Sequence, residues 1–282
     1  MEGSFTKNAS EWRRNMTLSE QEFGRIVSYI KARTGIELGQ KRVLIAGRLE
    51  NYLIKNGYNS YADYMNMVEK DASGKEATML INRLTTNHTY FMREPVHFHF
   101  LKDRILPVLK EKEKHTKDLR IWSAAASTGE EAYTTAMLLK DFFGLEQGWD
   151  TTILATDIST RALEKAQKGE FLCEQISVLP ENWQRRYFKK TGAETCILSP
   201  EIRNNVLFRY FNLMDPFPFK KRFHVIFLRN VMIYFDEDTK AALLKKMYDF
   251  LEPGGYLFIG TTETLDKTRS AFQYVQPSIY RK

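Results

Sequence analysis

Two carboxylates follow an apolar segment and a tight turn near the middle of the chain. Residues 119–131 read Leu-Arg-Ile-Trp-Ser-Ala-Ala-Ala-Ser-Thr-Gly-Glu-Glu, which predicts a buried strand, a turn and a helix that begins with Glu130 and Glu131. Parallel sheets bind ligands at such strand-to-helix crossings. The turn has one glycine, Gly129, and so lacks the dinucleotide pattern G-x-G-x-x-G. Acids at a helix start repel phosphate but suit an amine or a sulfonium, which favours S-adenosylmethionine over a nucleotide.

A second apolar segment, residues 152–157, ends in Asp157. An acid at the end of the second strand is placed to accept hydrogen bonds from a ribose diol. Asp157 could equally be the N-cap of the helix that follows. The acidic turn upstream favours the ligand.

Residues 85–94, Thr-Thr-Asn-His-Thr-Tyr-Phe-Met-Arg-Glu, form a polar and aromatic cluster before the predicted sheet. Asn87 and Thr89 are short hydrogen-bonding groups, and Arg93 is a fixed cation. The alternative is a linker in which Arg93 pairs with Glu94 or with a neighbouring acid.

Two later strands also deliver polar side chains to their carboxyl ends. Asn212 follows one strand and could bind an adenine amine, although a turn asparagine is an equally simple explanation. Arg229 and Asn230 follow the apolar residues 225–228. An arginine so close to a buried strand needs a carboxylate partner, either from a substrate or from Glu131. An internal salt bridge would satisfy Arg229 without any ligand.

The bulk composition excludes several classes of protein. The 282 residues are 43% hydrophobic, and no apolar run approaches the roughly 18 residues of a membrane span. Two cysteines, Cys173 and Cys196, predict neither a disulfide framework nor a metal cluster, and the five histidines show no metal-binding spacing. The net charge of +7 is too small for a nucleic-acid-binding tail. We therefore expect a cytoplasmic protein without a metal or a nucleic-acid partner.

Part of the positive charge gathers near the N-terminus. Residues 24–55 carry seven bases and two acids, and Lys41, Arg48 and Lys55 recur every seven residues. On a helix these three side chains lie along one stripe. The stripe is either an ordinary solvated face or a docking surface for an acidic partner.

The pattern of apolar residues divides the chain into an all-helical part and an alternating part. Four helices are expected before residue 85: one from a capping box at residues 17–20 to Gly35, then 40–56, 60–69 and 75–84. Residues 94–113 have helical character. This pattern predicts an N-terminal helical domain over residues 1–85 and a second domain over residues 86–282.

From Leu119 onward, strands and helices alternate, which predicts a doubly wound, mostly parallel α/β sheet. The expected strands are 121–125, 152–157, 206–211, 224–228 and 256–260, and the expected helices are 130–143, 161–168 and 238–251. The alternation lapses over residues 177–205, where we expect a small inserted β-subdomain.

Four of these motifs, in this order, resemble the chemotaxis-receptor methyltransferase family, CheR. They are residues 85–94, 121–131, 155–158 and 228–235, and the resemblance extends over residues 17–281. It implies a Rossmann-like fold and transfer of a methyl group from S-adenosylmethionine to glutamate side chains of methyl-accepting chemotaxis proteins. It also implies Arg93 and Tyr234 as catalytic residues. The implied cofactor contacts are Asn87, Thr89, Arg93, Glu131, Asp157, Asn212, Leu213, Arg229 and Asn230.

The resemblance also bears on partners. Family members dock on receptor helices through the N-terminal domain, which favours the docking interpretation of Lys41, Arg48 and Lys55. The segment between Phe188 and Val206 is shorter than in members that hold a receptor pentapeptide, and it has one glycine. We therefore expect a monomeric, pentapeptide-independent enzyme.

Other functions remain open from the sequence. One departure from the family is Ala132, where proline is usual, and this affects only helix preorganisation. Residues 228–231, Leu-Arg-Asn-Val, lack the Pro-Pro-Tyr motif of nucleic-acid amino-methyltransferases. The alternatives are the same chemistry on another signalling protein and a non-catalytic S-adenosylmethionine-binding scaffold.

Overall fold

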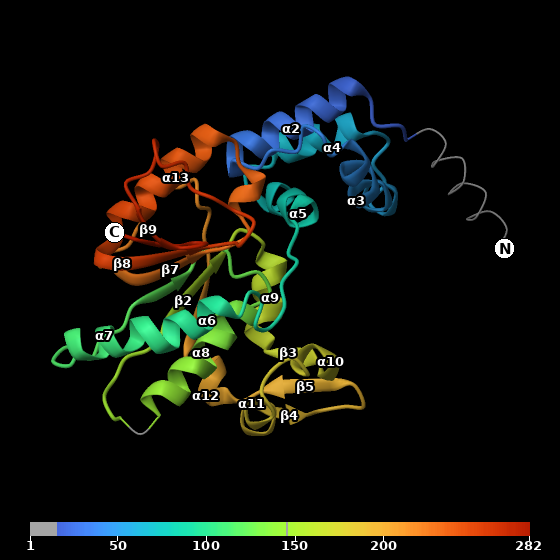
Figure 1. The fold of residues 1–282 in the computed structure, drawn as a ribbon. Coiled ribbons are helices and arrows are strands. Elements are labelled where there is room, and N and C mark those ends of the chain that lie inside the picture. The colour runs from blue at the N-terminus through green and yellow to red at the C-terminus, as the bar shows by residue number, and fades with distance from the viewer. Residues whose placement is uncertain (1–15, 145) are drawn as a thin grey trace. The chain divides into compact units, whose positions relative to one another are not determined.

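The computed structural model describes residues 16–144 and 146–282, and the chain divides into two compact units between Thr86 and Asn87 (Figure 1). Each unit has a core of its own. In the described residues, no helix combines the length and the apolar character that a membrane crossing requires. These residues also contain no group of three or more histidine, cysteine, aspartate or glutamate side chains that could hold a metal ion.

Residues 16–86 of the first unit form four helices. They are α2 (Glu20–Thr34), α3 (Arg42–Lys55), α4 (Tyr61–Lys70) and α5 (Lys75–Leu84). The predicted capping box at residues 17–20 is wrong by two residues, because Ser19 and Glu22 form it. Gly35 ends α2 in the left-handed conformation and Ser60 caps α4, as predicted.

The second unit begins with α6 (Val96–Phe100), a π-helical turn (Leu101–Ile105) and α7 (Leu106–Lys112), which together form the predicted helical segment. The parallel strands are β1 (Ile121–Ser123), β2 (Ile153–Asp157), β6 (Val206–Tyr210), β7 (Phe223–Leu228) and β8 (Leu251–Ile259). The main helices between them are α8 (Glu130–Phe143), α9 (Thr160–Lys168) and α13 (Glu237–Asp249).

The main sheet has the strand order β6-β2-β1-β7-β8-β10-β9. Its first five strands are parallel, whereas β10 (Ile279–Arg281) pairs antiparallel with both β8 and β9 (Gln273–Gln276). Helix α13 lies on one face, and α6 and α8 lie on the other (Figure 1). The predicted doubly wound, mostly parallel fold is confirmed. The chain order reverses direction between β1 and β7, which is where such sheets bind ligands.

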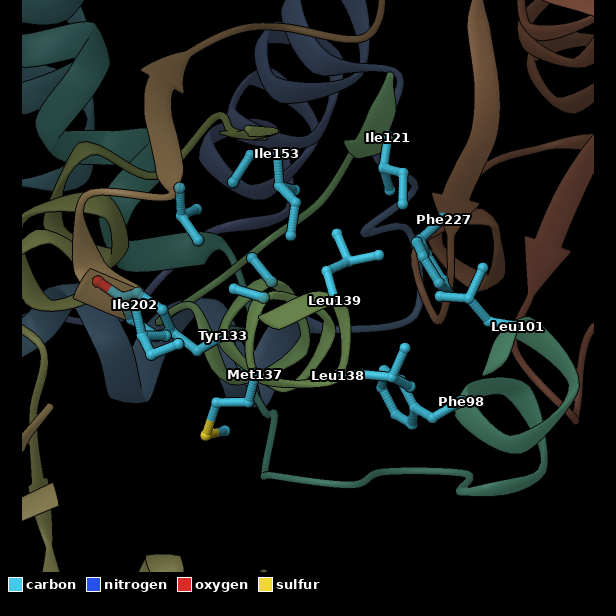
Figure 2. Close-up of a cluster of buried hydrophobic side chains, with 14 of the residues drawn as sticks. Phe98, Leu101, Ile121, Tyr133, Met137, Leu138, Leu139, Ile153, Ile202 and Phe227 are labelled. Carbon is cyan, nitrogen blue, oxygen red and sulfur yellow. The ribbon is translucent and has the colours of Figure 1, made fainter. Parts of the chain in front are cut away.

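Buried apolar side chains of α8 fix this helix against the sheet. Tyr133 and Leu139 are fully buried, and Leu139 lies toward Ile121 of β1 and Ile153 of β2 (Figure 2). Phe98 of α6 and Phe227 of β7 stack with 6.2 Å between their ring centroids. This packing holds the start of α8, and therefore its acids, at the carboxyl ends of the strands.

Most predicted bounds differ from the structure by one or two residues, and two differ by more. Strand β8, predicted from residue 256, begins at Leu251 and runs through Pro253-Gly254-Gly255, where it shifts register against β7. The small sheet, of order β3-β5-β4, begins at residue 170 instead of 177. Its strands are β3 (Glu170–Leu172), β4 (Phe188–Lys190) and β5 (Thr195–Leu198), with helices α10 (Cys173–Ile176), α11 (Glu181–Tyr187) and α12 (Pro200–Arg203) beside them.

The prediction that the cysteines form no disulfide is wrong. Strands β3 and β5 pair antiparallel, with Phe171 opposite Cys196, and this brings the Cα atoms of Cys173 and Cys196 to 5.5 Å, where a disulfide joins them. The pairing spans 23 residues and depends on strand register, which composition alone does not reveal.

Candidate active site

The predicted site residues of the second unit gather at the carboxyl edge of the parallel sheet. Asp157 is the last residue of β2, and Arg229 and Asn230 directly follow β7. Glu131 lies in the first turn of α8, after β1, and Asn212 follows β6. Because these strands run parallel, their carboxyl ends lie on one edge, and the polar groups meet there.

Asp157 is buried and held by backbone N–H groups. Its Oδ2 accepts from the N–H of Ser127 and its Oδ1 from the N–H of Ser159, each at 2.8 Å. Burial raises the pKa of Asp157, although these hydrogen bonds favour the charged form. The N-cap of α9 is Ser159, whose hydroxyl accepts from Ala162, so Asp157 is not the cap. Its remaining lone pairs suit a diol.

Asn87 joins the same loops. Its amide nitrogen donates to the Ser159 hydroxyl at 3.1 Å, and its carbonyl accepts from the Ser127 hydroxyl at 3.0 Å. Thr89 is half-buried in the same segment. The segment that precedes α6 therefore closes on the turns after β1 and β2.

Arg229 is neutralised from two sides. Its side chain is 2% exposed, its Nη1 donates to Glu131 at 2.7 Å, and its Nη2 lies 3.1 Å from a Glu94 oxygen. Nη2 also donates to the carbonyl of Arg93. The other oxygen of Glu131 accepts from the Ser123 hydroxyl at 2.7 Å. The internal salt bridge considered for Arg229 is thus present, with Glu131 as one partner.

Glu94 is a site residue that the sequence reasoning missed. Its carboxylate accepts from Arg229, from the amide of Asn230 at 3.2 Å and from the N–H of Thr261 at 3.2 Å. Burial opposes ionisation, but the Arg229 charge and these hydrogen bonds outweigh it, so the pKa of Glu94 lies below its usual value. No local pattern marked these hydrogen bonds, because Arg229 and Asn230 lie more than 130 residues from Glu94.

Arg93 stands in contrast to Arg229. Its Nη1 donates to the His88 carbonyl at 2.8 Å, and its guanidinium lies 5.7 Å from the Tyr90 ring centroid. The Arg93–Glu94 pair considered from the sequence does not form, because Glu94 turns to Arg229. Over residues 16–144 and 146–282, no carboxylate lies within ion-pair distance of Arg93.

Asn212 and Leu213 form the turn after β6. The side-chain oxygen of Asn212 accepts from the N–H of Met214 at 3.0 Å, as a turn asparagine does, and Leu213 is buried. Lys246 of α13, which the sequence reasoning missed, donates to the carbonyls of Leu213, Met214 and Asp215. Burial lowers the pKa of Lys246. The Lys246 ammonium group fixes this turn, because it donates to three successive carbonyls.

The backbone around the site is unusual. Met92, Glu94, Ser127 and Asn230 all have positive φ angles between 51° and 58°. Such conformations cost free energy and persist where surrounding contacts hold them, often at functional sites. Tyr234 ends a short 3-10 helix (Met232–Tyr234) that follows Asn230, and its side chain is half-buried.

The predicted docking residues lie on α3 or next to it, in the first unit. Lys41 precedes α3, and both Lys41 and Lys55 are exposed. Arg48 instead donates through Nη1 to the carbonyls of Leu84 and Thr85, at 2.8 and 2.9 Å, at the end of α5. Part of the Arg48 charge is therefore used to cap a helix.

The residues at the sheet edge fit S-adenosylmethionine. Asp157 offers a buried carboxylate for a ribose diol, and Leu213 offers an apolar surface beside the Asn212 amide. The turn of residues 124–129 has neither the glycine spacing nor the basic side chain of a phosphate-binding loop. These groups match a nucleoside that bears a sulfonium better than one that bears phosphates.

Comparisons with known proteins support this assignment. The family described as CheR methyltransferase, SAM binding domain, matches residues 87–281, and the CheR methyltransferase all-alpha domain matches residues 21–85. A chemotaxis protein methyltransferase of Borreliella burgdorferi is 37% identical over 280 residues, covering 98% of this chain and 99% of that protein. One of Escherichia coli is 36% identical over 271 residues, covering 94% of this chain and 92% of that protein.

Among solved structures, the glycopeptide N-methyltransferase MtfA complexed with S-adenosylmethionine matches at a TM-score of 0.31 and 18% identity. The match covers 50% of this chain and 46% of that one. Both CheR domains match in order, and the relatives cover almost the whole chain. The resemblance seen in the sequence is confirmed, as is S-adenosylmethionine as the cofactor: the chain belongs to the CheR methyltransferase family.

Proposed function

We propose that this protein transfers a methyl group from S-adenosylmethionine to glutamate side chains of chemoreceptor cytoplasmic helices, in the cytoplasm. The relatives are named chemotaxis protein methyltransferases, which supports the pathway. The proposal for the reacting group rests on the residues of the site.

The observation that carries the proposal is the contrast between two arginines. Arg229 is buried between Glu94 and Glu131, so its charge is fully compensated. Arg93, the residue before Glu94, instead donates to the His88 carbonyl and lies over the Tyr90 ring. A partly exposed guanidinium that pairs with no carboxylate of the described residues suits a carboxylate substrate, which it can bind in a bidentate manner.

The chemistry needs little acid–base help from the protein. A glutamate side chain is already ionised near neutral pH, since its usual pKa is about 4.3. When bound, S-adenosylmethionine supplies a methyl group on a sulfonium, which is an electrophile without further activation. The task of the protein is to position the carboxylate and to exclude water.

The residues divide this task. Arg93 orients the substrate carboxylate, and Arg229 fixes Arg93 by binding its carbonyl. Asp157 and Asn87 would hold the ribose side of the cofactor, and the turn with Asn212 and Leu213 the adenine. Thr89, Glu131, Arg229 and Asn230 would complete the cofactor site, and Tyr234 would line the reacting centre.

The test is transfer of a labelled methyl group to receptor cytoplasmic fragments, with alkali lability as the sign of a methyl ester. Arg93→Ala should lower turnover about 10²-fold, since it removes the positioning group, while cofactor binding is retained in part. Arg104→Ala, at an exposed arginine of the same unit, is the control. Full turnover of Arg93→Ala would contradict the assigned role.

The wild-type result separates the alternatives. No transfer to receptor fragments, together with measurable cofactor binding, would favour a different signalling protein as substrate or a scaffold role. Label that resists alkali would point to nitrogen instead of carboxylate methylation.

Docking on the receptor is assigned to the stripe of Lys41, Arg48 and Lys55. Lys41 lies in a surface hollow on α3 beside Val43, which is 88% exposed. We propose that Lys41→Glu with Lys55→Glu raises the receptor KM and leaves cofactor affinity unchanged. Arg48 is left intact in this test because it caps α5. An equal effect of Lys70→Glu with Lys75→Glu, which reverses two exposed charges elsewhere in the unit, would show that the stripe is only solvated.

Pentapeptide independence is proposed from the short connection between β4 and β5, residues 191–194. Removal of the last residues of the receptor should leave the methylation rate unchanged. A large fall in rate would show that the small sheet binds the receptor tail.

A further inference from the structure

A buried carboxylate that the proposed reaction does not use lies beyond the end of β8. Glu263 is 6% exposed. Its Oε2 accepts from the N–H groups of Gly260 at 2.6 Å and Asn230 at 2.9 Å, and its Oε1 accepts from the N–H of Ile233 at 3.1 Å. Throughout the described ranges, no lysine, arginine or histidine lies within ion-pair distance of Glu263. Backbone N–H groups are therefore its partners.

Two of these N–H groups belong to the turn that follows β7. Asn230 has a φ of 56°, and Ile233 is the middle residue of the 3-10 helix that ends at Tyr234. The N–H groups at the start of a helix have no partner within it, and a carboxylate is a strong acceptor for them. Glu263 thus caps this short helix from the loop that follows β8 and holds Asn230 in its left-handed conformation.

The side chains of Asn230 and Glu263 leave no room for a larger residue at position 260. A Cβ atom at Gly260 would lie 2.4 Å from the Asn230 amide nitrogen and 2.9 Å from Glu263 Oε2. Glu94 accepts from that same amide nitrogen and from the N–H of Thr261. Asn230 is therefore held at its side chain by Glu94 and at its backbone by Glu263.

We propose that Glu263 is a positioning residue for methyl transfer. It sets Asn230 at the cofactor and Tyr234 at the reacting centre by fixing the backbone that joins them. This inference rests on the proposed function, which assigns those two residues to the site. It deepens that function by naming a group that touches neither the cofactor nor the substrate.

Both carboxylate oxygens of Glu263 accept hydrogen bonds, so a replacement residue needs an acceptor at both positions. Glutamine keeps the length of the side chain, and its one oxygen can accept from Asn230 and Gly260. Its NH₂ group would then face the N–H of Ile233, so two donors oppose each other. Glu263→Gln should therefore release mainly the 3-10 helix, and Glu263→Ala should release both segments.

The experiment measures kcat, receptor KM and cofactor affinity for Glu263→Gln, Glu263→Ala and Gly260→Ala. Thr262→Ala, at the exposed neighbouring position, is the matched control. We expect Glu263→Gln to lower kcat by about tenfold, and Glu263→Ala by about 10²-fold, since small misplacements of reacting groups cost this much. Receptor KM should stay nearly constant, and cofactor affinity should fall more for the alanine variant than for the glutamine variant.

A lower melting temperature with unchanged kcat per folded molecule would overturn the proposal, because that result describes a purely structural residue. If Glu263→Ala fails to fold, Glu263→Gln decides. If wild-type protein methylates no receptor fragment, the proposed function fails separately, and cofactor affinity becomes the readout. Weaker cofactor binding by Glu263→Ala or, if it does not fold, by Glu263→Gln would still support the positioning of Asn230 by Glu263, and unchanged binding would overturn it.

Discussion

Replacement of Arg229 by methionine tests the charge network at the centre of the site. Methionine keeps an apolar side chain but removes the guanidinium, which lies 5.6 Å from the Phe98 ring centroid, so Glu94 and Glu131 lose the cation that they share. Removal of one partner from a buried ion pair costs about 3–5 kcal/mol. The side chains of Glu94 and Glu131 are 12% and 13% exposed, so water partly solvates them. The expected loss in the free energy of unfolding is therefore at the low end of this range, at about 3 kcal/mol.

The loss should depend on pH in a defined direction. In the wild type, the lowered pKa of Glu94 contributes stability above its unfolded pKa, and this contribution is lost as pH falls through the folded pKa. Without Arg229, burial dominates and raises the pKa of Glu94, so the ionised form becomes a cost that grows as pH rises. The difference between variant and wild type should therefore be larger near about pH 8 than near about pH 5.

Urea unfolding followed by tryptophan fluorescence measures this difference, since Trp122, Trp149 and Trp183 lie in the second unit. Arg185→Met is the matched control, because Arg185 pairs with Glu181 on the surface at 81% exposure of both side chains. Exposed pairs of this kind contribute less than about 1 kcal/mol. A penalty at Arg229 that equals the control, or that shrinks with rising pH, would refute the reasoning.

Three further changes follow from the contacts of the site. Asp157→Asn should weaken cofactor binding by roughly 10- to 100-fold, because it removes charge-assisted hydrogen bonds to the ribose, and calorimetry that finds no change would contradict this role. Lys246→Met leaves the carbonyls of residues 213–215 without their donor, so it should lower the stability by about 1–3 kcal/mol and also lower cofactor affinity. Unchanged stability and affinity would show that these hydrogen bonds do not hold the turn. Burial lowers the pKa of His97 to about 4, so the folded protein loses up to about 3 kcal/mol of stability as pH falls from about 6.5 to about 4, and the stability of His97→Gln should vary less with pH over this range in unfolding experiments.

Local patterns in the sequence predicted most of the elements. The helix over residues 75–84 and the helix over residues 130–143 have the predicted bounds, because helical spacing and flanking residues mark both ends. The strand β8 was predicted too short, since Pro-Gly-Gly reads as a helix stop, while pairing with β7 extends the strand through it. There, pairing with β7 outweighed the local preference of Pro-Gly-Gly for a turn.

For the site, too, the order of the elements predicts some features and tertiary contacts decide others. Parallel strands place their carboxyl ends together, so the position of Asp157, Asn212 and Arg229 at one edge follows from the order of the elements alone. Which partner each side chain takes does not follow. Arg48 had the spacing of a surface stripe, yet it caps α5, because the end of that helix reaches its guanidinium.

The sequence by itself determined the type of fold, the edge of the sheet that carries the site and the family, since each depends on short patterns and on their order. Only the tertiary structure decided that Glu94 joins Glu131 in neutralising Arg229, that no carboxylate of residues 16–144 and 146–282 pairs with Arg93, and that Glu263 holds the backbone of Asn230. The contacts of Arg229 with Glu94 and of Asn230 with Glu263 join residues 135 and 33 positions apart in the chain. The physical reason is that a buried charge takes whatever partner the folded chain brings within about 3 Å, and sequence spacing does not encode that distance.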